Sequence, residues 1–153
     1  DTFIYSHNNV VWGVPNTFES NFESSIFKYI DYNTSPKTQG IGYIVDDTLI
    51  QSVYIFENFG SIQLFSLDKF QDKIYYVIAL HGLFEYNESS QSNSLIQEIC
   101  DTRHIQSMSV SKNSGKLLIE EVKRTKVDGG IDAQSNIYLL DPVTGEKTPL
   151  LVE

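Results

Sequence analysis

The chain has little cysteine, proline or positive charge, and it has no long apolar run. The single thiol, Cys100, excludes an internal disulfide and a zinc site built from several thiolates. No stretch approaches the roughly eighteen consecutive apolar residues that predict a transmembrane helix. With 11 basic against 20 acidic residues and a net charge of −9, the chain lacks the clustered Lys and Arg that nucleic-acid binding requires. These absences predict no membrane span and no nucleic-acid partner.

Aromatic residues are abundant, with nine Tyr and nine Phe, and 41% of all residues are hydrophobic. Aromatic side chains suit the half-buried faces of a β-sheet. The apolar residues alternate with period two rather than 3.6. The sequence therefore predicts an all-β protein without helices, in which Cys100 is most simply a buried strand residue.

A repeat organises these strands. Residues 62–78 read IQLFSLDKFQDKIYYVI, and residues 105–121, 43 positions later, read IQSMSVSKNSGKLLIEE. The two align without a gap as a strand, a polar turn and a second apolar strand. A repeat of this length with four short strands per unit is typical of a β-propeller blade. We predict one all-β domain, 1–153, containing blades at 10–53, 62–100 and 105–152.

The last unit has the clearest signals. Strands are expected at 105–110, 116–123, 136–140 and 147–152, with a polar loop over 124–135. Gly115 supplies the left-handed position of the first turn, while Asp141 and Gly145 are suited to cap and close the last. Pro149 fits only an edge strand because it lacks an amide donor.

The segment MSVSKNSGKLL, 108–118, resembles the repeat of TolB-type propellers, in which a Ser-Pro-Asp-Gly-Lys turn joins two strands. Ser111, Gly115 and Lys116 are kept here with one extra residue, while the Pro-Asp pair is lost. NIYLLDPVTGEKTPLL, 136–151, resembles the third strand and hairpin of the same repeats. Similar units build the propellers of prolyl oligopeptidase and dipeptidyl-peptidase type serine peptidases, and the six-bladed propeller lipoproteins of gut bacteria.

The resemblance implies a module that binds proteins or shields an active site, in a periplasmic or extracellular setting. A closed propeller needs at least about four blades. Three units leave open sheet faces, so either a longer chain or a second chain would complete the ring. We therefore expect a protein partner or self-association, with carbohydrate as a further candidate ligand.

Catalytic and metal-binding patterns are not found in the sequence. Serine hydrolysis of this kind uses a G-x-S-x-G motif, which the chain does not contain. His7, His81 and His104 lack the spacing of a zinc site. Asp128 and Asp132 are too few for a calcium loop. Glu120 and Glu121 are adjacent in a strand and so point to opposite faces. No catalytic residue, cofactor or metal is predicted.

Five aromatic residues are candidates for a binding surface, because aromatic side chains at the rim of a β-protein are enriched in interfaces. If they face outward from loops, they would form a surface for a protein or a sugar; the alternative is packing between blades. The candidates are Phe18, Phe22, Phe56, Phe59 and Phe70.

The function expected from these observations is a non-catalytic β-propeller module for protein–protein interaction. One alternative is the gating propeller of a serine peptidase, and another is a carbohydrate- or envelope-associated propeller lipoprotein. A third is a β-sandwich or barrel with a site for a small ligand or for adhesion, because similar strand counts and turn spacing allow it.

Overall fold

A computed structural model of the chain describes residues 6–7, 10–12, 26–31, 38–46, 49–56, 64–100 and 102–150. All the regular structure in these residues is β-strand, arranged in antiparallel sheets, so the predicted all-β class is confirmed. No helix within them is long and apolar enough to cross a bilayer. The chain forms two compact units, residues 1–62 and 63–153, which are described separately.

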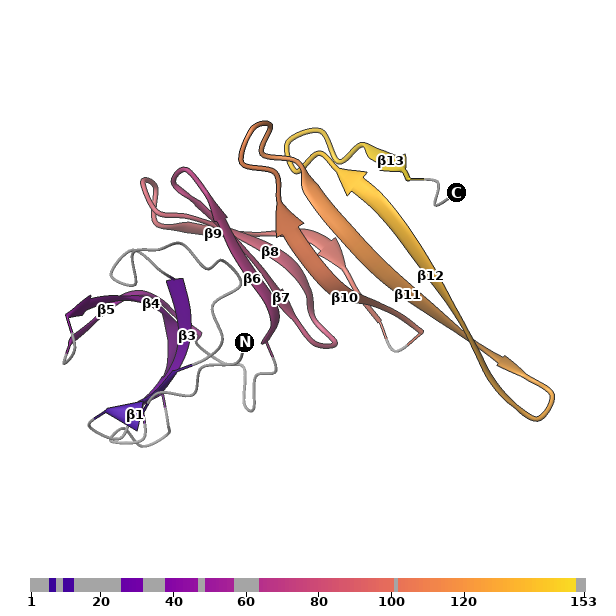
Figure 1. Cartoon of the computed structure of the whole chain (residues 1–153), viewed down its shortest axis with the longest axis horizontal. Coiled ribbons are helices and arrows are strands. Elements are labelled where there is room, and N and C mark those ends of the chain that lie inside the picture. Colours follow the sequence, from indigo (N-terminus) through magenta and orange to yellow (C-terminus); the bar gives the residue numbers. More distant parts are fainter. Residues whose placement is uncertain are drawn as a thin grey trace. The chain divides into compact units, whose positions relative to one another are not determined.

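The first unit holds a five-stranded sheet whose strands follow chain order (Figure 1). The strands are β1 (Ser6–His7), β2 (Val10–Trp12), β3 (Ile26–Asp31), β4 (Thr38–Asp46) and β5 (Leu49–Ile55). Ile26 and Ile41 are buried in it. The segment 10–53, predicted as the first blade, contains β2, β3, β4 and most of β5, while β1 precedes it.

The second unit holds two four-stranded sheets, each also in chain order. One comprises β6 (Leu64–Phe70), β7 (Lys73–Ile78), β8 (Gly82–Asn87) and β9 (Ser92–Glu98). The other comprises β10 (Arg103–Val110), β11 (Leu117–Val127), β12 (Gly130–Leu140) and β13 (Lys147–Pro149). We call them the β6–β9 sheet and the β10–β13 sheet.

Three local predictions for the last sheet are confirmed. Gly115 and Gly145 have φ of 72° and 74°, in the left-handed region that glycine tolerates best. Asp141 Oδ1 accepts hydrogen bonds from the amides of Val143 (2.9 Å) and Thr144 (3.2 Å), which caps the turn. Pro149 lies in β13, the last strand of its sheet.

The prediction of a polar loop over 124–135 is wrong. β11 and β12 remain paired out to Val127 and Gly130, so this segment is a long two-stranded arm beyond the rest of the sheet (Figure 1). Every residue of the arm from Lys123 to Asn136 is exposed. Main-chain pairing across a tight turn requires no apolar side chains, so polar composition alone did not reveal these strands.

The core of the second unit lies between its two sheets. Tyr75, Val77 and Leu83 of the β6–β9 sheet pack against one face of the β10–β13 sheet. That face is apolar and nearly inaccessible, and its buried members are Ile105, Met108, Val110, Leu117, Ile119, Tyr138 and Leu140. β6 and β10, the first strands of the two sheets, lie side by side (Figure 1). The sheets therefore stack face to face with their first strands together.

Candidate functional site: the joint between two sheets

Two side chains of β6 hold the neighbouring strand β10 by its main chain. Ser66 Oγ accepts a hydrogen bond from the Met108 amide at 3.1 Å, and Asp68 Oδ2 accepts one from the Val110 amide at 2.7 Å. Both acceptors are buried, with 6% of Ser66 and 2% of Asp68 exposed. Because β10 is the first strand of its sheet, these side chains satisfy amides on its edge that no strand of its own sheet pairs.

The Asp68 carboxylate is further compensated on its second oxygen. Lys112 Nζ lies 2.8 Å from Oδ1, and the Lys69 amide donates to the same oxygen at 2.8 Å. Lys112 also donates to the Lys69 carbonyl at 2.6 Å. A buried carboxylate is costly unless it is paired and hydrogen-bonded, and here both conditions are met.

A second buried carboxylate joins the far ends of the two sheets. Glu121, 5% exposed, accepts hydrogen bonds from Gln97 Nε2 at 3.0 Å and from the Tyr138 hydroxyl at 3.2 Å. Arg103 Nε lies 3.5 Å from its other oxygen. Gln97 belongs to β9 and the other three to the β10–β13 sheet, so this network links the sheets through side chains alone. The opposite faces predicted for Glu120 and Glu121 are confirmed, since Glu120 instead accepts from Ser107 Oγ at 3.1 Å.

Tyr138 remains a neutral hydrogen-bond donor in this network. Burial raises its pKa to about 12, and the neighbouring Glu121 carboxylate adds to the effect, against an opposing hydrogen bond from Gln97. Lys147 Nζ lies over the Tyr138 ring, 4.7 Å from its centre, in a cation–π contact. A shallow hollow opens beside these groups, lined in part by Arg103, Asn136 and Leu150.

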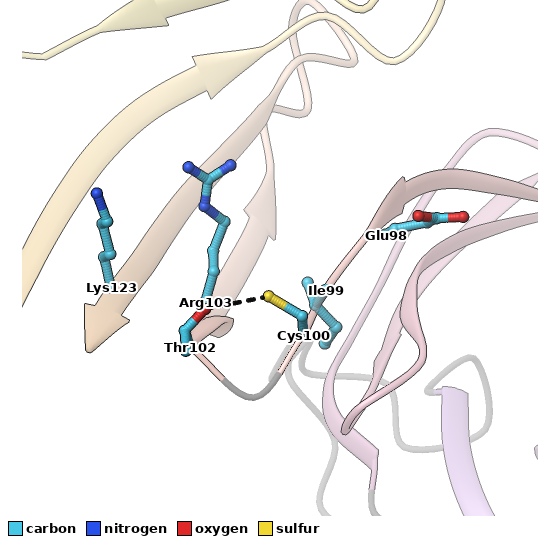
Figure 2. Close-up of a pocket in the computed structure, with 6 residues that line it drawn as sticks. All are labelled: Glu98, Ile99, Cys100, Thr102, Arg103 and Lys123. Atoms are coloured by element: carbon cyan, nitrogen blue, oxygen red, sulfur yellow. Dashed lines mark hydrogen bonds between the residues drawn. The ribbon is translucent and has the colours of Figure 1, made fainter. Parts of the chain in front are cut away.

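The connection between the sheets borders a second hollow, shown in Figure 2. Arg103 projects from β10 and Lys123 from β11, while Cys100 and Thr102 lie on the connection itself. The residues lining it are Glu98, Ile99, Cys100, Thr102, Arg103 and Lys123.

The prediction that Cys100 is buried in a strand is wrong. The thiol is free and exposed, on an isolated bridge with Arg103 just after β9 ends. Its Sγ lies 3.4 Å from Thr102 Oγ1. Hydrogen bonds to Thr102, aided by Arg103, lower its pKa from the ordinary value. The apolar neighbour Ile99 takes the buried position instead, and β9 itself ends at Glu98, two residues before Cys100.

The histidines and acidic residues considered in the sequence are scattered in the described part of the chain. His7 is in β1, His81 is exposed after β7, and His104 is half-buried in β10. Asp128 and Asp132 lie at the tip of the β11–β12 arm and are exposed. Over the ranges that the structure describes, no three His, Cys, Asp or Glu side chains gather in a way that could hold a metal ion.

Two of the five aromatic candidates are described, and both pack inward. Phe56 is 7% exposed and contacts Tyr54 edge to face, with ring centres 5.4 Å apart. Phe70 packs against the core of the second unit. Phe18, Phe22 and Phe59 lie outside the described residues, so the aromatic surface stays a prediction.

Sequence reasoning missed the residues that join the sheets. Ser66 and Asp68 are polar positions in an alternating strand, which is the usual pattern of a solvent-facing row. The signal that could have found them is the hairpin register, because they pair with Val77 and Tyr75 and so share the buried face of these residues. This arrangement can bind a β-sheet, because the β6–β9 sheet offers an apolar face and two acceptors for main-chain amides.

No protein-family model matches the chain, and a comparison with curated proteins found no significant match.

Proposed function

We propose that this chain is a non-catalytic β-propeller-type module that binds other proteins through the faces of its sheets. One observation carries the proposal: the β6–β9 and β10–β13 sheets stack face to face with their first strands together. Each sheet is a simple up-and-down meander in chain order. Such a unit uses one face for one neighbour and leaves the other for the next.

The polar groups of the joint support a binding role over a catalytic one. Asp68 and Glu121 are the two buried carboxylates among the described residues of the second unit, and each is engaged by a cation and by hydrogen-bond donors from the neighbouring sheet or its own. Groups satisfied in this way hold strands in register. The exposed apolar side chains Leu118 and Leu95 supply further contact area on sheet faces.

Cross-linking of the tagged chain in its native cells, followed by mass spectrometry, tests the proposal. We expect a stoichiometric protein partner, either another protein or a second copy, with cross-links that fall on the sheets of the second unit. Recovery of the chain without any stoichiometric protein partner would contradict the function. Lys123 and Lys126, exposed on the arm, provide reactive amines on β11 of the second unit.

A further inference from the structure

The two sheets of the second unit are structurally equivalent, and their bulges set the correspondence. β6 carries an irregularity between Leu64 and Ser66, and β10 carries one between Ile105 and Ser107. Matching the bulges makes Ser107 the counterpart of Ser66. The ungapped sequence alignment holds for β7 and β11 but is wrong by two residues for β6 and β10. The reason is the connecting turn: residues 71–72 join β6 to β7, whereas 111–116 join β10 to β11.

One face of the β6–β9 sheet contacts the β10–β13 sheet through five residues. Its two acceptors are Ser66 and Asp68, and its apolar floor is Tyr75, Val77 and Leu83. All five are at most 6% exposed because the β10–β13 sheet covers them. We call this set the covered face.

The counterpart of the covered face on the β10–β13 sheet is open. Through the bulge match and the strand registers, its members are Ser107, Ser109, Leu118, Glu120 and Ile137, which we call the open face. Ser107 and Ser109 are exposed, Leu118 is 40% exposed, and Glu120 and Ile137 are partly exposed. The two hydroxyls stand where Ser66 and Asp68 accept main-chain amides on the covered face.

We propose that the open face is a docking site for another sheet of this repeat. The incoming sheet presents its first strand so that two amides, two residues apart, donate to the Ser107 and Ser109 hydroxyls. On the open face, Leu118 and Ile137 provide the apolar contacts that Tyr75 and Leu83 provide on the covered face. This inference rests on the proposed function and adds to it the surface and the kind of partner.

The differences between the faces fit a weaker joint than the one within the chain. Ser109 replaces Asp68, so the incoming strand loses a charge-assisted hydrogen bond and a partner for its lysine. Glu120 replaces Val77 and introduces a carboxylate, to which Ser107 Oγ already donates at 3.1 Å. Burying that carboxylate costs free energy, so a Glu120→Val change should tighten docking.

A tandem chain provides the test, with the full chain followed directly by a second copy of residues 101–150. The connection between the last strand and the added first strand is then residues 150–153 plus 101–102, six in all. The existing connection from β9 to β10 is residues 99–102, which is four, so the linker is long enough. The added sheet carries the same amides, Met108 and Val110, that the covered face binds.

Thiol labelling reports whether the open face becomes covered. In a Cys100→Ser background, a Leu118→Cys change places a thiol in the open face of the first copy. We expect its labelling rate to fall at least about tenfold in the tandem chain relative to the single chain, a 1.4 kcal/mol effect. A Val143→Cys change, at a turn position that is 82% exposed, is the matched control and should label equally in both chains.

Equal labelling of Cys at position 118 in the single and tandem chains overturns the proposal, whether the added sheet is unstacked or unfolded. A Glu120→Val change in the first copy gives an independent reading, because it should lower the labelling rate further if the face docks as described. Equal labelling would overturn only the docking site on the open face. The proposed function would still be tested separately, since cross-linking in cells can find a protein partner on another face.

Discussion

Asp68 illustrates how much a single side chain contributes to the joint between sheets. It is 2% exposed and binds the Val110 amide of the next sheet at 2.7 Å. An Asp68→Ala change leaves that amide without its acceptor, which costs roughly 1–3 kcal/mol. We expect a loss of this size in the free energy of unfolding, measured by urea denaturation. Ser109→Ala, at the exposed position that corresponds to Asp68, should change the free energy of unfolding by less than about 0.5 kcal/mol. Equal losses in the two variants would show that Asp68 does not stabilise the contact between the sheets.

Tyr138 makes stability depend on pH in the alkaline range. Its pKa in the folded protein is about 12, mainly because the phenol is buried, against a usual value of 10.0. The unfolded chain therefore loses this proton at lower pH than the folded chain, and stability falls as pH rises between these values. Burial also raises the pKa of Tyr75, so both phenols contribute to this fall.

A Tyr138→Phe variant isolates that contribution. Its free energy of unfolding should fall less steeply with pH over the same range than that of the unaltered chain, while Tyr75 still contributes. The comparison concerns the slope, because removal of the hydroxyl also removes a hydrogen bond to Glu121 at every pH. Parallel urea titrations from pH 9 upward measure it; identical slopes would mean that Tyr138 titrates normally in the folded protein.

Among the elements, the β10–β11 turn connects local conformation to packing. Gly115 has φ of 72°, and a Cβ there would lie 2.7 Å from the Phe70 ring of the other sheet. Gly115→Val should therefore destabilise the chain by several kcal/mol, through backbone strain and displacement of a core aromatic. Gly129→Val is the control, since its φ is 93° but nothing lies within 4 Å of its added Cβ.

Thermal unfolding distinguishes the two glycine variants. The control carries the cost of the backbone conformation alone, so the difference between the variants reports contact with Phe70. A smaller loss for Gly115→Val than for Gly129→Val would contradict the packing described for this turn.

The same elements show how far local patterns reach. Gly115, Gly145 and Asp141 were predicted because a turn depends on residues adjacent in the chain. The β11–β12 arm was missed because polar, glycine-containing segments form exposed ladders and loops alike. Asp and Gly, the residue types of Asp128 and Gly129 at the tip of the arm, are common both in hairpin turns and in loops.

At the scale of the whole molecule, the net charge of −9 opposes the folded state by self-repulsion. Salt should screen this repulsion, so we expect the urea midpoint at neutral pH to rise with added sodium chloride. Near the isoelectric point of about 4.7 the rise should disappear, which provides the internal control. A midpoint that falls with salt at neutral pH would mean that ion pairs such as the partly buried Lys73 with Glu85 outweigh the repulsion.

The sequence by itself determined the β class, most strand positions in the second unit and the turns between them, because period-two alternation and turn chemistry act over a few residues. Tertiary structure decided which polar residues are buried, placing Asp68 and Glu121 inside and Cys100 outside. It also decided that one sheet face is covered while its counterpart is open. Those outcomes depend on contacts such as that of Asp68 with Val110, 42 residues apart, which no local pattern encodes.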